Sequence, residues 1–509
     1  MDAQLLTQIP HLEEIAHRGA FSGTPEKHTE NFLERSSREN KILPSLEDAI
    51  RAAGLKDGMT ISFHHHFRGG DHVVNQVVEK LAEMGLKNLT LAASSLAAVH
   101  APLIRHIKSG VITHIETSGL RGELAEEISR GLMDCPVVFR SHGGRAAAIR
   151  SGELHIDVAF LGAPSCDPYG NANGYSRDDE HMACGSMGYA RTDAEYADKV
   201  VVLTNHLVRY PNAPWAIPED NVDYIVVVDD IGDPKGIMSG ATRYTKNPKE
   251  LLIAQTAAQV IDAAGYFYDG FSMQMGSGGA SLAAARFLRE MMLERNIRCR
   301  FALGGITGQI AAMHEEGLID RVLDVQSFDL DAAMSLKNNR FHHQISATYY
   351  ASFLSAAAVD QLDFVILSAL EIDTDFNVNV LTGSDGVIRG AIGGHPDTAA
   401  GASLSIVVAP LTRGRIPCVI DRVNTVVTPG GTVDVVVTDQ GVAVNPRRPE
   451  VERKLRRAGI KVYTIEELRD KALALVGRPD PIRYTDRVVG VVMYRNNTII
   501  DVIRQVDES

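Results

Sequence analysis

The sequence predicts an α/β protein made of two tandem, similar domains, each with a largely parallel sheet flanked by helices. Three observations support this fold class. The chain has 509 residues, too many for a single hydrophobic core. Apolar runs end in glycine-rich turns that open helical patterns, the repeating unit of a parallel α/β sheet. The chain also resembles itself, because residues 156–174 match residues 362–380 at an offset of 206.

The elements follow in order along the first half. Residues 1–44 are polar and charged and are expected to form an irregular, partly helical arm. From Ser45 a helix runs to Gly54, a strand follows over residues 59–67, and a second helix opens at Gly69 and Gly70. We assign residues 45–235 to the first domain and 236–509 to the second, meeting near residues 233–247.

Two further pairs of segments extend the repeat. Residues 197–204 match 403–410 at the same offset, and residues 56–71 match 268–281 at an offset close to 212. The second copy places Glu371 where the first places Ser165, whereas Asp167 and Asp373 match. The halves are therefore alike in fold but not in chemistry.

Composition excludes several functional classes. With a net charge of −13 and no basic stripe, the chain is not expected to bind nucleic acid. The N-terminus lacks an apolar core of the signal-peptide kind, and no window of 18 apolar residues occurs, so we expect neither export nor a membrane span. The five cysteines form no C-x-x-C pair, which favours a reducing cytoplasm over a disulfide framework or a zinc site.

Glu371 is the first candidate catalytic residue. It stands just past the apolar run of residues 364–370, and ligands of open parallel sheets bind beyond the carboxyl ends of the strands. The alternative is a carboxylate that caps a turn, and position alone leaves the two interpretations open.

The stretch GVIRGAIGGHPDTAAGAS (386–403) supplies the missing specificity. Together with SALEIDTDFNVN and GMTISFHHHFRGGD, it resembles the coenzyme A transferase superfamily, in which a strand-end Glu precedes a loop of the form G-x-G-G-x-x-D. The segments TSGLRGELAEEISRGL, DVAFLGAPSCDPYGNANGY and FALGGITGQIAAMHEEGLIDRV are similar to one branch, the α subunits of citrate lyase. The resemblance spans residues 45–506.

The resemblance implies two domains of the coenzyme A transferase type with the active site between them. It implies a transfer from acetyl-acyl-carrier protein to citrate, giving citryl-carrier protein and acetate through an acyl anhydride. The implied partners are the β subunit, the γ acyl carrier protein and further copies of this chain. The thioester arrives on the carrier's dephospho-coenzyme A derivative or as acetyl-coenzyme A, with no cofactor held tightly by this chain. Either Glu371 or citrate's own carboxylate attacks the thioester.

The glycine-rich loop is the expected oxyanion site. Backbone amides preset at a developing oxyanion contribute roughly 3 kcal/mol each, and glycine lets the backbone approach closely. We assign catalytic roles to Glu371, Gly393 and Gly394, and expect Gly390 and Asp397 to shape and orient the loop around the thioester carrier group. A tight turn without chemistry is the alternative.

Two other glycine-rich turns are candidates for the carrier's phosphate-bearing arm, since amides at a helix N-terminus attract anions. They are Arg68-Gly69-Gly70 and the turn of Gly276, Gly278 and Gly279; simple strand-to-helix turns are the alternative. Citrate calls for arginines, which bind carboxylates in a fork. Candidates in glycine-rich settings are Arg68, Arg121, Arg145 and Arg389.

Two further clusters are interpreted as structural. His64, His65 and His66 alternate faces on a strand and lack a third ligand at a recognised spacing, so no metal is expected. Cys166 has no histidine partner pattern and is expected to be a buried thiol. Other functions stay open for this fold: transfer to citramalate or another small acid, thioester hydrolysis, or ligand sensing without catalysis.

Overall fold

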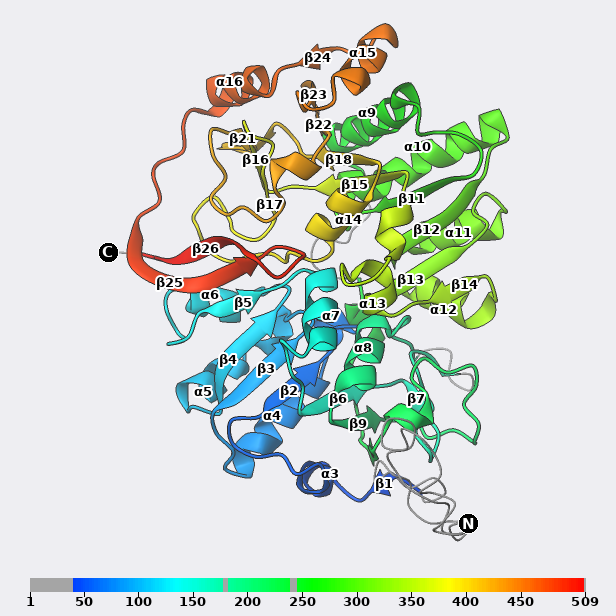
Figure 1. The fold of residues 1–509 in the computed structure, drawn as a ribbon, viewed down its shortest axis with the longest axis vertical. Helices are drawn as coiled ribbons and strands as arrows, with labels where there is room; N and C mark the ends of the chain where they lie inside the picture. Colours follow the sequence, from blue (N-terminus) through cyan, green and yellow to red (C-terminus); the bar gives the residue numbers. More distant parts are fainter. Residues whose placement is uncertain (1–39, 177–181, 239–244, 508–509) are drawn as a thin grey trace, which may run out of the picture. The chain divides into compact units, whose positions relative to one another are not determined.

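The computed structural model describes residues 40–176, 182–238 and 245–507. Most of the predicted arm of residues 1–44, namely residues 1–39, lies outside the described residues. Residues Lys41–Ser509 form one compact unit. This unit contains two large sheets covered by helices (Figure 1).

The first sheet has ten strands, and the eight that precede the C-terminal strand pair in spatial order are parallel to their neighbours. In spatial order they are β1 (Ile42–Leu43), β10 (Tyr224–Val227), β9 (Lys199–Thr204), β6 (Val158–Gly162), β2 (Thr60–Phe63), β3 (Leu89–Ala93), β4 (Ile112–Thr117), β5 (Val137–Phe139), β25 (Tyr484–Met493) and β26 (Ile499–Val506). Its helices are α3 (Leu46–Ala52), α4 (Val73–Glu83), α5 (Leu103–Lys108), α6 (Glu123–Ser129), α7 (His142–Ser151) and α8 (Gly188–Tyr196).

The second sheet has nine strands. In spatial order they are β14 (His342–Gln344), β13 (Val322–Ser327), β12 (Cys299–Ile306), β11 (Phe271–Met275), β15 (Phe364–Ser368), β18 (Leu404–Val408), β22 (Val435–Thr438), β23 (Gly441–Val444) and β24 (Val462–Tyr463). Its helices are α9 (Pro248–Ala264), α10 (Gly279–Arg295), α11 (Gly308–Glu315), α12 (Leu330–Asn338), α13 (Ala347–Ala351), α14 (His395–Gly401), α15 (Pro449–Arg457) and α16 (Ile465–Val476).

The two sheets repeat one topology. Strands β10-β9-β6-β2-β3-β4-β5 correspond in order to β22-β18-β15-β11-β12-β13-β14, and every neighbouring pair in both runs is parallel. Small antiparallel pairs follow the equivalent strands: β7 (Ser165–Cys166) with β8 (Ala172–Asn173), and β16 (Glu371–Asp373) with β17 (Val378–Asn379). The predicted fold class is confirmed.

The C-terminal strand pair corrects one part of the predicted domain division. Strands β25 and β26 were expected in the second domain, but β25 pairs in parallel with β5 at the edge of the first sheet (Figure 1). The chain therefore returns to the first half after α16. The boundary near residue 235 stays a prediction.

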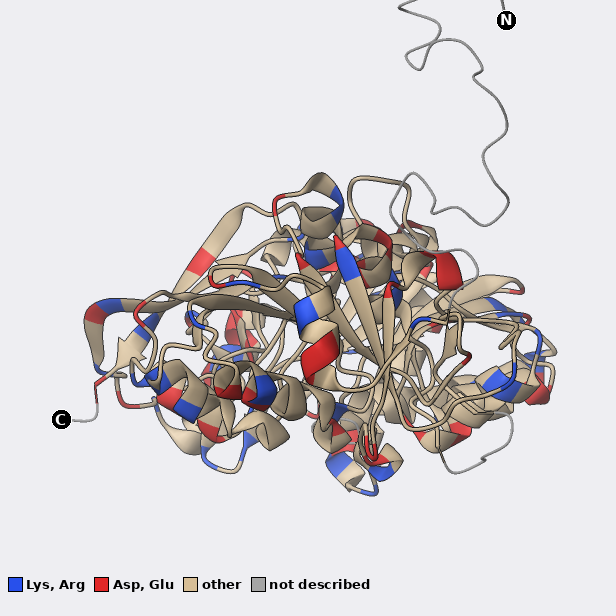
Figure 2. Cartoon of the chain, turned by 90° about the horizontal axis from the view of Figure 1, so that it is seen from below, with Lys and Arg blue, Asp and Glu red and all other residues tan. Residues whose placement is uncertain are grey.

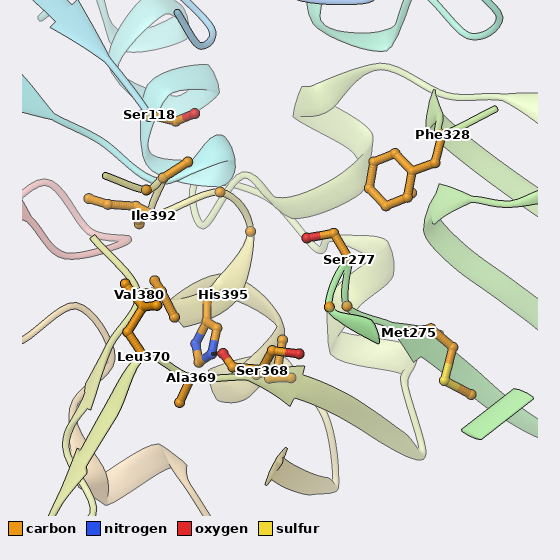
Figure 3. Close-up of a pocket in the computed structure, with 18 of the residues that line it drawn as sticks. Ser118, Met275, Ser277, Phe328, Ser368, Ala369, Leu370, Val380, Ile392 and His395 are labelled. Atoms are coloured by element: carbon orange, nitrogen blue, oxygen red, sulfur yellow. Dashed lines mark hydrogen bonds between the residues drawn. The ribbon is translucent and has the colours of Figure 1, made fainter. Parts of the chain in front are cut away.

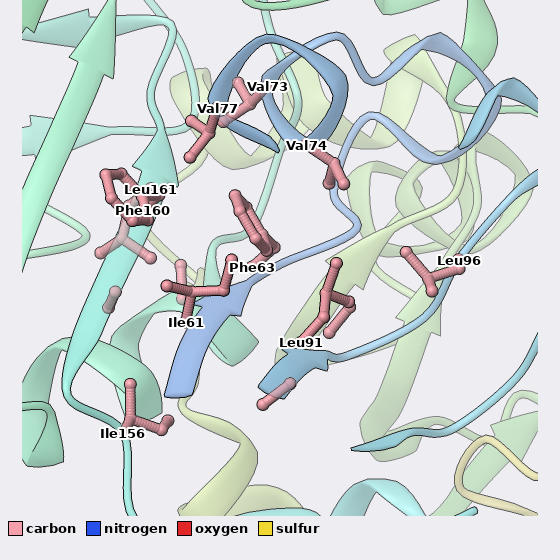
Figure 4. Close-up of a cluster of buried hydrophobic side chains, with 14 of the residues drawn as sticks. Ile61, Phe63, Val73, Val74, Val77, Leu91, Leu96, Ile156, Phe160 and Leu161 are labelled. Carbon is pink, nitrogen blue, oxygen red and sulfur yellow. The ribbon is translucent and has the colours of Figure 1, made fainter. Parts of the chain in front are cut away.

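Continuous apolar strands are buried on both faces. Residues 200–203 of β9 are fully buried, as expected for a parallel sheet with helices on each side. In the first half, Ile61 and Phe63 of β2 pack with Val77 of α4 and Phe160 of β6 (Figure 4). Helices on the outside carry acidic and basic residues close together (Figure 2), including the i,i+4 ion pair of Arg286 and Glu290.

Local signals explain the element ends. Helix α3 begins where the Ser45 hydroxyl accepts a hydrogen bond from the Asp48 amide, and the chain leaves it at Gly54, which has a φ of +69°. Strand β2 ends at Phe63, earlier than predicted. Residues 68–70 form a 3-10 turn, and α4 begins only at Val73, so the helix does not open at the two glycines. Because Gly70 packs against the backbone of Asp233, no side chain could stand there.

Candidate active site

A cavity of about 540 Å³ lies beyond the carboxyl ends of strands from both sheets. From the first half it is lined after β2 by His65 and Arg68, after β3 by Ser95, after β4 by Ser118 and Arg121, and at α7 by His142. From the second half it is lined by residues 274–280, Gly305, Gln326, Phe328, Tyr350, residues 367–370, residues 389–395 and Arg413. Figure 3 shows Ser277 pointing into this space on the opposite side from Ile392.

The loop at Gly390 to Gly394 forms one wall of the cavity, and its role at an oxyanion stays a prediction. It has two residues between its first two glycines, one more than the expected pattern. Gly393 has a φ of +57°, and Gly394 follows at φ −91° and ψ 14°. In the described part of the chain, neither amide has a hydrogen-bond partner, whereas Ile392 donates to Ser118 O at 2.7 Å. Consecutive residues of opposite φ form an anion-binding nest.

Asp397 does not line the cavity but holds this loop. Its carboxylate accepts hydrogen bonds from Ser141 Oγ and from the Gly143 amide, both at 2.9 Å, and the His142 amide donates to Gly393 O at 2.9 Å. Burial raises the pKa of Asp397 to about 6, against these two hydrogen bonds and the attraction of Arg495. The carboxylate thus fastens the loop of the second half to the N-terminus of α7.

Glu371 lies behind the wall rather than on it. The neighbouring residues Leu370, Val380 and Arg413 line the cavity, whereas the Glu371 side chain is buried. Its carboxylate accepts from Asn379 Nδ2 at 2.8 Å, from the Asn424 amide at 3.1 Å and from Asn424 Nδ2 at 2.9 Å. Burial raises the pKa of Glu371, and these hydrogen bonds oppose the shift.

The first half has an equivalent of this arrangement without the carboxylate. Ser165, which matches Glu371 in the repeat, accepts at Oγ a hydrogen bond from Asn212 Nδ2 at 3.1 Å. Asp167 accepts from three backbone amides of its turn. Asp373 accepts from two amides of its own turn and from the distant Val423 amide. The aspartates therefore shape the turn in both copies, and Glu371 is the change specific to the second.

The four candidate arginines differ in whether they line the cavity and in whether they form an ion pair. Arg145 is buried away from the cavity and binds both carboxylate oxygens of Asp193, at 2.6 and 2.9 Å. Arg389 lines the cavity but pairs with Asp385. Arg121 lines the cavity and has no ion pair among the described residues; burial lowers its pKa.

Arg68 lines the same wall as Arg121. Its backbone has a φ of +53°, an unusual conformation for a residue with a side chain, and its guanidinium lies 5.2 Å from the centre of the Phe328 ring. Burial and the repulsion of Arg121 lower the pKa of Arg68 to about 10. Two desolvated cations side by side make this wall attractive to an anion.

The side chains of the three histidines after β2 lie in different places. His64 and His66 lie together, with ring centres 4.3 Å apart, and His65 turns to the cavity. Burial lowers the pKa of each, so the imidazoles are neutral at neutral pH. Cys166 is buried as predicted, and burial raises the pKa of its thiol.

The two turns proposed for the carrier arm differ. Gly69 and Gly70 do not line the cavity, and the Gly70 amide already donates to Phe67 O. Gly276, Gly278 and Gly279 do line it, with Gly278 at the N-cap of the 17-residue helix α10. The Gly276 amide already donates to Ile366 O at 2.7 Å, so it is not available to a ligand. Gly278 and Gly279 are therefore the part of this turn that we consider for anion binding.

Sequence reasoning missed several residues of this site. Asn379 could have been found, since it repeats Asn173 at the offset of 206. Asn424, Tyr350 and Phe328 carry no motif and reach the site only through tertiary contacts. His142 stands directly before the glycines of SHGGRAA and is the first residue of α7. Ser141, the N-cap of this helix, is the sequence signal that could have located it.

Comparison with known proteins decides the family. The family model of the citrate lyase alpha subunit matches residues 39–506. The chain belongs to the citrate lyase alpha subunit family. It is 59% identical to the citrate lyase alpha chain of Escherichia coli (strain K12), over 96% of this chain and 95% of that one. It is 58% identical to the alpha chain of Haemophilus influenzae, over 97% and 98% of the two chains.

A solved structure agrees with this assignment. The crystal structure of a citrate lyase alpha subunit from Streptococcus mutans, described as a complex with citrate, is 55% identical to this chain. It superposes with a TM-score of 0.91 over 96% of each chain. Among the described residues, no helix has the length and hydropathy that a membrane crossing requires.

Proposed function

We propose that this chain transfers the acyl carrier protein from acetyl-carrier protein to citrate, giving citryl-carrier protein and acetate. The observation that carries the proposal is one cavity with a cationic wall and a wall of amides that have no hydrogen-bond partner within the described part of the chain. Arg68 and Arg121 supply charge for an anionic substrate, and Gly393 and Gly394 supply donors for an oxyanion. The bound citrate of the Streptococcus mutans relative supports the choice of acid.

Citrate's carboxylates bind Arg121 and Arg68. A carboxylate oxygen then attacks the acyl carbon of the thioester, and the carbonyl electrons move to oxygen. The nest at Gly393 and Gly394 stabilises that charge, and removal of one such donor costs about 2.7–4 kcal/mol. Collapse of the intermediate breaks the carbon–sulfur bond, and the thiolate leaves with the electron pair. When citrate is the nucleophile, this step forms an acetyl-citrate anhydride. The thiolate then attacks the citryl carbonyl carbon of the anhydride, and the carbon–oxygen bond breaks to release acetate and leave the citryl thioester. The attack comes from citrate or from Glu371, which requires Glu371 to turn from its asparagines into the cavity.

The acetyl thioester enters over the turn of Gly278 and Gly279, where the N-terminus of α10 faces the cavity and favours phosphate. The thioester arrives on the prosthetic group of the γ acyl carrier protein, and the β subunit cleaves the citryl product. The chain works in the cytoplasm within a complex that contains several copies of it. These assignments rest on the family.

An exchange assay tests the proposal. The purified chain is mixed with acetyl-coenzyme A as surrogate carrier and isotopically labelled citrate, and thioesters are followed by mass spectrometry. Labelled citryl thioester is the expected product. If none forms, even with the carrier protein itself, the citrate assignment is wrong, and citramalate and other small acids become the candidates. Acetate without citryl thioester would indicate a hydrolase.

Two variants assign roles in the same assay. Arg121→Gln is expected to raise the KM for citrate by about 10- to 100-fold with the KM for acetyl-coenzyme A unchanged, since a charged hydrogen bond is worth about 1.5–3 kcal/mol. Arg389→Gln, at an arginine already paired with Asp385, is the matched control. Glu371→Gln keeps the shape of the side chain. Loss of citryl thioester in that variant supports attack by Glu371, and persistence supports attack by citrate.

A further inference from the structure

His142 is a cavity residue that no motif pointed to. It is the first residue of α7. Its ring packs against Tyr189 in a tilted arrangement, with centroids 4.5 Å apart, and stacks on His65 at 5.7 Å. Its backbone amide donates to Gly393 O, while Ser141 and Gly143 on either side bind Asp397. The contacts of the ring with Tyr189 and His65, and the hydrogen bond from the backbone amide to Gly393 O, therefore fix the imidazole beside the glycine loop.

The Nε2 atom of His142 lies beside the nest. A Cβ built on Gly393 would stand 3.7 Å from it. Among the described residues, Nε2 has no hydrogen-bond partner, and it is not among the buried unpaired atoms, so it is accessible from the cavity. The other ring nitrogen, Nδ1, is buried and also has no partner.

This asymmetry selects the tautomer. A buried N–H without an acceptor is rarer and more costly than a buried acceptor without a donor. The proton therefore belongs on Nε2, where it faces the cavity, and Nδ1 is the bare acceptor. Burial and the nearby Arg145 and Arg121 lower the pKa of His142 to about 3, so the imidazole stays neutral at neutral pH.

We infer that His142 is a catalytic residue whose Nε2–H donates a hydrogen bond to the thioester oxygen, beside the amides of Gly393 and Gly394. The inference rests on the proposed function, because it takes the acyl group to bind at the nest. The oxyanion site is then built from both halves of the chain. His142 keeps its proton throughout: the carbonyl electrons move to oxygen on attack and return when the carbon–sulfur bond breaks.

The test uses the carbonyl itself. The full chain is saturated with [1-¹³C]acetyl-coenzyme A, and the carbonyl stretch of the bound thioester is measured by isotope-edited infrared spectroscopy. Hydrogen bonding to the oxygen lowers this frequency. The native protein and His142→Gln, whose side-chain amide can reach the Nε2 position, are expected to show a lowered frequency. His142→Ala and His142→Asn are expected to lose part of the shift.

Kinetics in the exchange assay give a second readout. His142→Ala is expected to lose about 100-fold in kcat with little change in the KM for citrate, and His142→Gln to recover much of that loss. His314→Ala is the matched control, because His314 also has a buried, unpartnered ring nitrogen but lies on α11 outside the cavity lining. It should leave the carbonyl frequency unchanged.

The outcomes separate two failures. A native protein that binds no acetyl thioester would overturn the proposed function and this inference with it. A bound carbonyl with the same frequency in native protein and His142→Ala would overturn only the role of His142. An increase in the KM for citrate without a fall in kcat would also overturn it, by making His142 part of the acid-binding wall.

Discussion

The buried carboxyl of Asp397 yields a prediction about stability and pH. Asp397 is fully buried and receives two hydrogen bonds, and its pKa is raised from 3.8 to about 6. The folded protein therefore holds a proton on this carboxyl more tightly than the unfolded chain does. Stability from this group is fully present below about pH 4 and is lost as the pH rises through about 6.

The size of the effect follows from the same values. A difference of about two pH units corresponds to about 3 kcal/mol of unfolding free energy. Asp397→Asn imitates the protonated carboxyl, since its amide can accept from Gly143 and donate to Ser141. The variant is therefore expected to be more stable than the native protein at pH 8, by up to about 3 kcal/mol, with the difference falling to about 1 kcal/mol at pH 4.5.

Urea unfolding of both proteins between pH 4.5 and 8 measures this difference, and the subtraction cancels the other carboxyls that the two share. Asp397→Ala is the control: it leaves the Gly143 amide without an acceptor and should destabilise the protein at every pH. A gap between native and Asn variant that stays constant across the pH range would refute the reasoning. A less stable Asn variant at pH 8 would refute it as well.

Further predictions concern the glycine loop and the cysteines. Gly393→Ala should cost about 1–2 kcal/mol of stability from its φ of +57°, with space for the methyl group. Gly394→Ala should displace Tyr350, because the new Cβ would overlap the Tyr350 hydroxyl. Melting temperatures and kcat for the two variants check this, and equal stability of Gly393→Ala and native protein would contradict it. Iodoacetamide should label Cys135 first in the native protein, because the other four thiols are buried; peptide mass spectrometry checks the order, and early labelling of Cys166 would contradict it.

The sequence by itself determined the fold class, the repeat and the family. They follow from local patterns and from spacing along the chain, namely apolar strands buried on both faces and glycine turns. The offset of 206 residues aligns Glu371 of the second copy with Ser165 of the first. Such features depend on near neighbours and on the period of the secondary structure, so they can be read without a three-dimensional model.

Only the tertiary structure decided which candidates meet. Arg145 and Arg121 both stand in glycine-rich segments. Arg145 is neutralised by Asp193, whereas Arg121 faces the cavity with no ion pair to any described residue. The pairing of β25 with β5 in the first sheet is likewise decided by residues that are far apart in the sequence. The reason is physical: whether a charge is paired or a strand finds an edge depends on groups far away in sequence, and desolvation acts on position in space.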